Sequence, residues 1–333
     1  MAAWPWSATG VHLVTGESVE GVYVLANDAI LPWARSFVRS FRLYNPTLRL
    51  CLIPFDDAAD ECIRLVRQAG GEVLADTGQF ARLDRIGQML ELGITPYGKH
   101  WFRRFAAFEG PFDRFLYLDS RVVVLGDLSP IVAEIVPGVC DFIHFDSMIN
   151  EVYQEGPIRR AFTLAGLGHG FNSGMWASRR SLFTHDQMQS AASALVGVRG
   201  EMNPRNTDQF FLNYLCDSHA VHAVHFADLR ADYTHACWAG DGGSVYRDTD
   251  GAWRRWKFGD PEHRRRVPFI HWAGFRLHPA MPHFHMFDRF QTPRYGVLRR
   301  CRAWLRGLPG RFVQALRARR SLNTLYHRLA SRR

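Results

Sequence analysis

Short apolar runs alternate with amphipathic segments along the first part of the chain. Each run ends in a polar or proline-containing turn, which is typical of a buried strand. The segments between the runs carry apolar residues three and four positions apart, the spacing of one helix face. We predict strands at residues 21–27, 49–54 and 72–75, with helices at residues 33–44 and 58–69. This alternation predicts an α/β fold with a parallel sheet covered by helices.

The same patterns of apolar residues predict further helices and strands up to about residue 226. The predicted helices lie at residues 79–92, 101–108, 129–136 and 207–215, and the predicted strands at residues 115–118, 121–125, 141–145, 173–178 and 223–226. Residues 233–288 have no clear period and are rich in Gly, Trp and His. Such segments commonly form loops around an active site, so we expect irregular structure there.

Charge is distributed very unevenly along the 333 residues, which carry a formal net charge of +9. Residues 289–333 hold 13 arginines and no Asp or Glu, so the remainder has 28 basic and 32 acidic residues. In this segment, apolar side chains such as Trp304 and Leu308 also follow helical spacing. We therefore expect an N-terminal extension (residues 1–20), a slightly acidic globular domain (residues 21–288) and a basic amphipathic helical tail (residues 289–333).

Three roles for the tail remain open at this stage. It can pack on the acidic domain, lie on an anionic membrane, or bind nucleic acid through phosphates and stacking. Nucleic acid is the partner we least expect. The chain has no apolar stretch long enough to span a bilayer, no signal-peptide pattern, and six scattered cysteines without a CxxC pair. We therefore expect a cytoplasmic protein, with the inner face of the membrane as a peripheral location.

The stretch FDRFLYLDSRVVVLGDL (residues 112–128) carries the most chemical information. Its apolar strand ends at Asp119, which places a carboxylate at the carboxyl edge of the sheet, where open α/β sheets bind ligands. A strand cap explains this residue equally well when it is taken alone. The motif resembles the DxD region of GT-A glycosyltransferases, in which two carboxylates at positions i and i+2 hold a divalent cation against the diphosphate of a nucleotide sugar.

Four further segments, in the same order along the chain, resemble glycosyltransferase family 8. They are ANDAILPWARSFVRSFRLYNP (residues 26–46), FNSGMWASR (171–179), NTDQFFLNYL (206–215) and HWAG (271–274). The likeness covers roughly residues 20–280 and is closer still to a bacterial sugar-transferase-like group. It implies a GT-A (Rossmann-like) fold, a nucleotide-sugar donor that is expected to be UDP-linked, and retention of the anomeric configuration. The acceptor is unknown, and a glycan or a lipid-linked group is the candidate.

The resemblance also implies roles for individual residues. Asn172, Asp208 and Gln209 would lie beside the transferred sugar and its anomeric carbon. The residues expected to bind the donor are Asn27, Asp28, Asp57, Arg103, Arg104, Asp119, Arg121, Gly174, His271 and Gly274. Two of these, Asp119 and His271, are also the candidate ligands of a metal ion. Purely structural roles would also explain some of these residues. Arg103 and Arg104 can lie on a solvated helix face, and Asp57 with its neighbour Asp56 can cap the N-terminus of a helix.

One position departs from the family pattern, because Arg121 stands where the second Asp of the DxD motif is expected. A guanidinium has no acceptor and stays protonated, so it cannot bind a cation. In one account Arg121 supplies the positive charge itself, and in a second the site has decayed into a non-catalytic nucleotide-sugar-binding or scaffold protein. In a third, Mn²⁺ or Mg²⁺ is held by Asp119 and His271 with further histidines. Those histidines are His278, His283 and His285.

Overall fold

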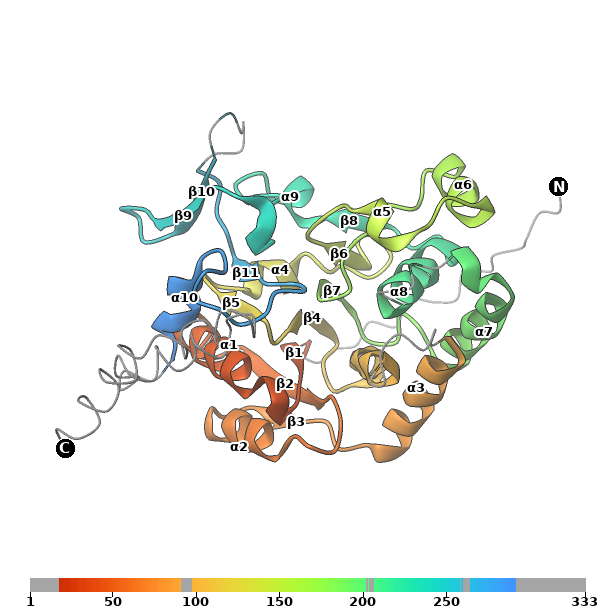
Figure 1. Cartoon of the computed structure of the whole chain (residues 1–333), viewed down its shortest axis with the longest axis horizontal. Helices are drawn as coiled ribbons and strands as arrows, with labels where there is room; N and C mark the ends of the chain where they lie inside the picture. Colours follow the sequence, from red (N-terminus) through yellow and green to blue (C-terminus); the bar gives the residue numbers. More distant parts are fainter. Residues whose placement is uncertain are drawn as a thin grey trace, which may run out of the picture.

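A seven-stranded sheet forms the centre of the part of the chain that the computed structural model describes, which is residues 18–90, 98–201, 203, 207–257, 259 and 264–291 (Figure 1). The strand order is β3-β2-β1-β4-β7-β6-β8. β1 pairs in parallel with β2 and β4, whereas β7 runs antiparallel to both β4 and β6. The predicted α/β fold with a mostly parallel central sheet is therefore confirmed.

The strands are short, and most coincide with an apolar run of the sequence. They are β1 (Glu20–Ala26), β2 (Arg49–Pro54), β3 (Glu72–Val73), β4 (Arg114–Asp119), β5 (Val122–Val124), β6 (Phe142–His144), β7 (Met175–Arg179), β8 (Ala223–His225), β9 (Ser244–Arg247), β10 (Trp253–Trp256) and β11 (Phe269–His271).

The helices connect these strands and flank the sheet. The α-helices are α1 (Leu31–Tyr44), α2 (Asp60–Gln68), α3 (Thr77–Leu90), α4 (Ser129–Ala133), α5 (Ile149–Val152), α6 (Pro157–Leu164), α7 (His185–Leu195), α8 (Thr207–Ser218), α9 (Phe226–Leu229) and α10 (Phe284–Arg289). The 3-10 helices are η1 (Asp28–Ile30), η2 (Gly98–Glu109), η3 (Val196–Glu201) and η4 (Ala239–Asp241).

The sheet has an apolar layer on each face, because successive side chains along a strand point to opposite sides. In β4, Leu116 and Leu118 join the layer formed with α1, α2 and α4. Phe115 and Tyr117 join the layer formed with α3, η2, α7 and α8. Asp119 continues the second series, so the strand delivers its carboxylate to the face that η2 and α8 cover. The five cysteines in the described residues are all buried and free.

The segment that we expected to be irregular, residues 233–288, contains regular structure. β9 and β10 form an antiparallel hairpin, and β11 pairs antiparallel with β5. In that second pair, His271 lies opposite Val122, directly after the DxD-like motif. The prediction failed because strands of three or four residues leave too few positions for a period to show.

Other differences are smaller. α7 begins with a capping box between Thr184 and Gln187, a signal that we did not use. None of the described helices is long and apolar enough to cross a bilayer. The end of the predicted helix at residues 79–92, most of the expected N-terminal extension and nearly all of the predicted tail lie outside the described residues.

Candidate active site

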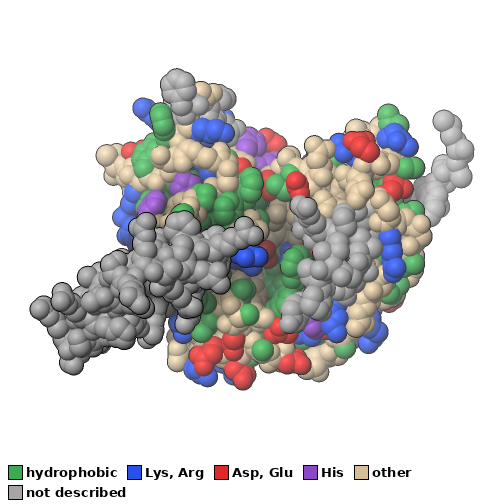
Figure 2. All heavy atoms as spheres, viewed as in Figure 1, with side chains coloured by type: hydrophobic (Ala, Val, Ile, Leu, Met, Phe, Trp, Pro, Cys, Tyr) green, Lys and Arg blue, Asp and Glu red, His purple; other side chains and the backbone are tan. Residues whose placement is uncertain are grey.

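A cavity of about 640 Å³ lies at the carboxyl ends of β1, β2 and β4. This edge is where parallel α/β sheets present ligand-binding loops. Figure 2 shows the hollow in this face of the molecule, with hydrophobic side chains around it. The polar and aromatic residues that line it are Asn27, Phe55, Asp56, Trp101, Arg104, Asp119, Ser120, Arg121, Asn172, Ser173, Asp208, Gln209 and His271.

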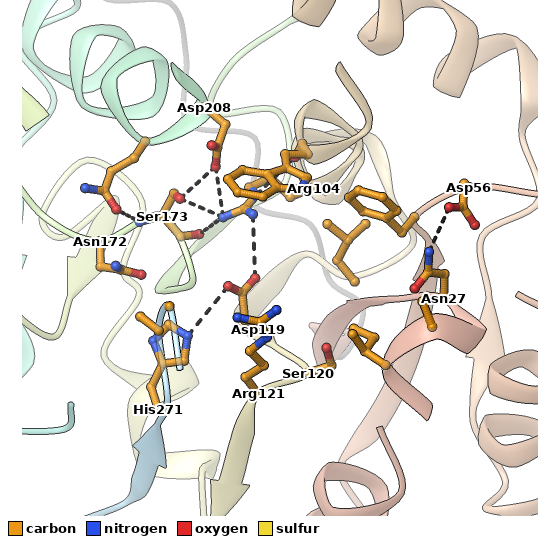
Figure 3. A pocket seen from close by; sticks show the side chains of 18 of the residues that line it. Asn27, Asp56, Arg104, Asp119, Ser120, Arg121, Asn172, Ser173, Asp208 and His271 are labelled. Carbon is orange, nitrogen blue, oxygen red and sulfur yellow. Dashed lines mark hydrogen bonds and ion pairs between the residues drawn. The ribbon is translucent and has the colours of Figure 1, made fainter. Parts of the chain in front are cut away.

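Arg104 of η2 lies at the centre of the polar network (Figure 3). Its Nη1 donates hydrogen bonds of 2.7 Å to both the carbonyl oxygen and the Oγ of Ser173, and its Nε donates to the carbonyl oxygen of Trp101 at 3.0 Å. Nη1 also lies 3.2 Å from Oδ2 of Asp208, and Nη2 lies 3.7 Å from Oδ1 of Asp119. One buried guanidinium therefore orients two carboxylates from different elements.

Both members of the Arg104–Asp119 pair are held in their charged forms. Burial alone would lower the pKa of Arg104, but the nearby Asp208, Tyr117 and Asp119 raise it above its usual range. Burial alone would raise the pKa of Asp119, but Arg104 and His271 bring it well below its usual range. The hydroxyl of Tyr117 donates a further hydrogen bond of 2.9 Å to Oδ1 of Asp119.

Asp208 and Gln209, at the start of α8, are fixed against the Ser173 backbone and side chain. Oδ2 of Asp208 accepts a 2.8 Å hydrogen bond from Oγ of Ser173, and Oε1 of Gln209 accepts one of 3.3 Å from its backbone nitrogen. The Gln209 amide then donates to the carbonyl oxygen of Glu151 at 3.1 Å. Oδ1 of Asp208 is buried and has no partner among the described residues. A buried oxygen without a hydrogen bond is unfavourable in free energy, so a ligand hydroxyl that donates to Oδ1 of Asp208 would be stabilised there.

His271 and Gly174 form the wall beside Asp119. The His271 ring is 1% exposed, its Nε2 lies 3.6 Å from Oδ2 of Asp119, and neither ring nitrogen has a hydrogen-bond partner in the described part of the chain. A Cβ on Gly174 would lie 2.5 Å from Oδ2 of Asp119 and 2.7 Å from Cε1 of His271. Gly174 does not line the cavity itself; it leaves the space in which these two side chains meet.

Asn172 is anchored by two hydrogen bonds. Its Oδ1 accepts a 2.7 Å bond from the backbone nitrogen of Gly174, and its own backbone nitrogen donates to Oδ1 of Asp146 at 2.8 Å. Burial raises the pKa of Asp146 to about 7, despite the bond from Asn172. Among the described residues, the side-chain amide nitrogen of Asn172 has no hydrogen-bond partner, and Asn172 lies on the cavity wall.

Asn27 and Asp56 line the cavity at the ends of β1 and β2. Nδ2 of Asn27 donates a 2.7 Å hydrogen bond to Oδ2 of Asp56, whose Oδ1 accepts one of 3.0 Å from the backbone nitrogen of Ala58. The rings of Phe55 and Trp101 line the cavity with them. The arrangement offers polar groups and flat apolar surfaces to a planar ligand.

Besides Gly174, three residues that we expected to bind the donor do not line the cavity. Asp28 accepts hydrogen bonds of 3.1 and 2.9 Å from two backbone N–H groups in the first turn of α2. Arg103 forms a two-point ion pair with Asp84, at 2.9 and 2.7 Å. Asp57 is also absent from the lining, whereas its neighbour Asp56 is present. In each case an adjacent residue faces the cavity instead.

Arg121 and Gly274 do line the cavity. The backbone oxygen of Arg121 accepts a 2.9 Å hydrogen bond from the backbone nitrogen of Trp272. Its Nη1 donates a single long bond of 3.4 Å to the carbonyl oxygen of Phe275. Gly274 has a φ of +72°, a conformation that favours glycine, so the chain turns sharply after β11.

The residues do not fit a divalent cation. Asp119 and His271 face each other, but His278, His283 and His285 are not among the lining residues. The described residues contain no group of three or more His, Cys, Asp or Glu side chains that could hold a metal ion. The account in which those histidines complete a metal site is therefore wrong.

Our sequence reasoning missed several residues of the site. Ser173 stands inside the FNSG segment that we did identify, and its hydroxyl connects Arg104 to Asp208. Trp101 begins the predicted helix at residues 101–108 and Phe55 follows the predicted strand at residues 49–54, but neither gives a chemical signal of its own. Asp146 follows the predicted strand at residues 141–145, and a polar residue after a central strand was the signal that could have found it.

Comparisons with known proteins give a fold but no sequence family. No family model matches the chain, and no curated protein matches it. An active-site mutant of LgtC shares 18% identity over 81% of this chain and 93% of that chain, with a TM-score of 0.52. The apo structure of WbbM, a bifunctional glycosyltransferase, shares 13% identity over 88% of this chain and 53% of its own, with a TM-score of 0.50.

A further similar structure is the galactosyltransferase LgtC in complex with donor and acceptor sugar analogues. It shares 16% identity over 81% of this chain and 94% of that chain, with a TM-score of 0.49. This chain spans about half the length of WbbM. The likeness to LgtC and WbbM shows that the described domain has the fold of solved glycosyltransferases, which confirms the GT-A fold predicted from the motifs.

Proposed function

We propose that this protein is a glycosyltransferase that moves a sugar from a nucleotide-sugar donor, expected to be UDP-linked, to a glycan or lipid-linked acceptor. One observation carries the proposal: buried Arg104 holds Asp119 and Asp208 on a cavity at the carboxyl edge of the sheet. Known glycosyltransferases share this fold. Fold alone does not decide activity, so the arrangement of these side chains provides the argument.

We assign the parts of the donor to three regions of the cavity. The nucleoside lies near Asn27 and Asp56, which offer hydrogen-bonding groups beside the aromatic rings. The diphosphate lies near Arg121, whose charge stabilises the negative charge that develops on the leaving group. The sugar lies near Asn172 and Asp208, because the free Oδ1 of Asp208 can accept a bond from a sugar hydroxyl. We expect a hexosyltransferase-like enzyme that retains anomeric configuration, as in the family that the motifs resemble.

A thermal-shift screen of nucleotides and nucleotide sugars tests this proposal. A ligand at about 100 times its Kd adds about 2.7 kcal/mol to the free energy of unfolding. We therefore expect at least one nucleoside diphosphate or its sugar to raise the Tm by about 5 °C or more, and the matching nucleoside to have little effect. If no nucleoside diphosphate or nucleotide sugar stabilises the protein, the proposal is wrong.

We also propose that residues 289–333 bind an anionic membrane and place the enzyme at the inner face, beside a membrane-linked acceptor. The support comes from the sequence, in which 13 arginines alternate with apolar positions at helical spacing. Flotation with vesicles that contain phosphatidylserine is expected to carry the full chain and to lose a chain that ends at Asp288. Equal flotation of both forms, or of neither, contradicts membrane binding by this segment.

A further inference from the structure

We propose that the guanidinium of Arg121 binds the donor diphosphate in the position where GT-A enzymes of the DxD type hold a divalent cation. This inference rests on the proposed function and specifies how its donor is recognised. It is carried by three features of the cavity: the charges already satisfied, the placement of Arg121, and the incomplete set of metal-binding groups.

The first feature is the distribution of charge along the cavity wall. Arg104 is buried and already pairs with Asp208 and Asp119. Asp56 accepts hydrogen bonds from Asn27 and from the backbone. Of the cations that line the cavity, Arg121 alone has no ion pair with any described residue. A dianionic ligand that enters the cavity therefore meets one uncommitted positive charge.

The second feature is the placement of Arg121. It follows Asp119 by two residues, across the bend between β4 and β5, and both side chains line the cavity. The hydrogen bond from Trp272 to its backbone oxygen fixes it next to the β5–β11 pair that carries His271. Figure 3 shows Arg121, Asp119 and His271 together on one side of the cavity.

The guanidinium itself is nearly free to bind a ligand. Its single hydrogen bond within the described part of the chain, to the carbonyl oxygen of Phe275, has a length of 3.4 Å and involves only Nη1. The other N–H groups have no partner among the described residues. A planar fork of donors matches two phosphate oxygens at once, which a single ammonium group cannot do.

The third feature is the set of metal-binding groups. Asp119 and His271 supply two side chains that could ligate a metal ion. The described residues offer no third His, Cys, Asp or Glu side chain to complete the site. Asp119 is also already engaged by Arg104 and by the hydroxyl of Tyr117. A divalent cation bound there would have to share the space with the positive charge of Arg121, which opposes its binding.

Calorimetric titration of the full chain with UDP, and with GDP and ADP in parallel, tests the inference. Each titration is run in EDTA and in Mn²⁺, with wild type, Arg121→Gln, Arg121→Lys and Arg121→Asp. We expect wild type to bind with the same Kd in both buffers, within about two-fold. Loss of a charged two-point contact should weaken Arg121→Gln by about 10- to 100-fold in both, with Arg121→Lys in between.

Arg121→Asp provides the reverse test, because it restores a second carboxylate beside Asp119 and His271. We expect this variant to bind UDP poorly in EDTA and at least tenfold more tightly in Mn²⁺, a gain that wild type does not show. The matched control is Arg276→Gln, an exposed arginine outside the cavity lining, which should bind like wild type. The Tm of each variant without ligand shows whether it folds.

Two results overturn the inference while the proposed function stands: wild-type binding that requires Mn²⁺, or a folded Arg121→Gln variant that binds as tightly as wild type in EDTA. A different result overturns the proposed function as well. In that case no nucleoside diphosphate binds the wild-type protein in either buffer. The two failures are therefore distinguished by the wild-type titrations alone.

Discussion

Arg103 and Arg104 are adjacent in the sequence but have different partners in the fold. Arg103 pairs with Asp84 outside the cavity, whereas Arg104 contacts Ser173 and two carboxylates inside it. Lysine keeps the charge of Arg104 but cannot reach all of these groups at once. Because the loss of these contacts leaves Asp119 and Asp208 less well positioned on the cavity wall, Arg104→Lys should weaken UDP binding by about tenfold or more, which corresponds to about 1.4 kcal/mol.

The matched control for this prediction is Arg103→Lys. This change also weakens an ion pair, so it should lower the free energy of unfolding, but UDP affinity should remain within about two-fold of wild type because Arg103 does not line the cavity. Calorimetry and urea denaturation on both variants separate the two effects. Equal losses of affinity in both variants would contradict the distinction.

Gly174 is required by space rather than by backbone conformation. Its added Cβ would lie within 2.5–2.9 Å of Asp119, His271 and Asn172, all of which lie on the cavity wall. Gly174→Ala should therefore displace these side chains, cost about 1–3 kcal/mol of unfolding free energy and reduce UDP affinity strongly. Gly126→Ala is the control, because nothing lies within 4 Å of its added Cβ. A Gly174→Ala variant that binds UDP like the control would show that the wall has room to adjust.

Asp146 gives a prediction about pH. Burial raises the pKa of its carboxyl group to about 7 in the folded protein, so the folded state holds this proton more tightly than the unfolded state. Its contribution to stability is therefore full below about pH 4 and is lost as the pH rises through 7.

Asp146→Asn removes this titration and keeps an oxygen acceptor for the Asn172 backbone. The unfolding free energy of wild type relative to the variant should fall between about pH 4 and 7, by up to about 1.4 kcal/mol per pH unit. Urea denaturation across that range measures the difference. The exposed Asp127→Asn change serves as the control exchange. A difference between wild type and Asp146→Asn that does not vary with pH would show that burial does not perturb this group.

The predicted site residues that do line the cavity belong to motifs with a required spacing. Asp119 ends an apolar strand, Asp208 and Gln209 begin a helix, and His271 ends a short strand, so backbone geometry brings each to the cavity. For two adjacent residues of the same type, the sequence did not predict which of them faces the cavity. Whether Asp56 or Asp57 faces the cavity depends on the exact turn after β2, which local sequence does not determine.

At the scale of elements, the β5–β11 pair positions the chemistry because Arg121, just before β5, and His271, the last residue of β11, lie at the same end of it. α1 supports it through Ser40, whose Oγ accepts a 3.0 Å hydrogen bond from the backbone nitrogen of Val124 and donates one of 2.9 Å to the carbonyl oxygen of Phe37. This serine is fully buried. Helix and strand are thus joined by a polar contact inside an apolar layer.

Ser40→Ala should leave the Val124 N–H group without a partner in the core. A buried donor without an acceptor costs about 1–3 kcal/mol, and urea denaturation should show a loss of that size. Ser193→Ala is the control, since this exposed serine of α7 donates only to its own helix. An unchanged free energy of unfolding in Ser40→Ala would mean that the β5 backbone finds another acceptor.

Elements with a clear apolar period were predictable, and those that depend on distant partners were not. β1, β2 and β4 have four or more buried residues in a row, and the sequence located all three. β9 and β10 have only one buried residue each, and they exist because they pair with each other. Their stability comes from that pairing and not from local preference.

At the scale of the whole molecule, the positive net charge and the site charge have separate origins. The excess comes from 13 arginines in residues 289–333, outside the motifs that define the fold. The cavity lining contains three acidic side chains (Asp56, Asp119 and Asp208) and two arginines (Arg104 and Arg121). The high net charge therefore gives no information about the chemistry of the cavity, which depends on where two arginines are placed.

The central claim is that this cavity transfers a sugar from a nucleotide donor. The most direct test is release of nucleoside diphosphate from a panel of nucleotide sugars by the full chain in EDTA, with wild type, Asp119→Ala and Arg121→Ala. We expect wild type to hydrolyse at least one donor slowly and both variants to lose that turnover by tenfold or more. A wild-type protein that binds nucleotide but never turns over any donor, with or without acceptor glycans and Mn²⁺, would contradict the claim and indicate a nucleotide-sugar-binding or scaffold protein.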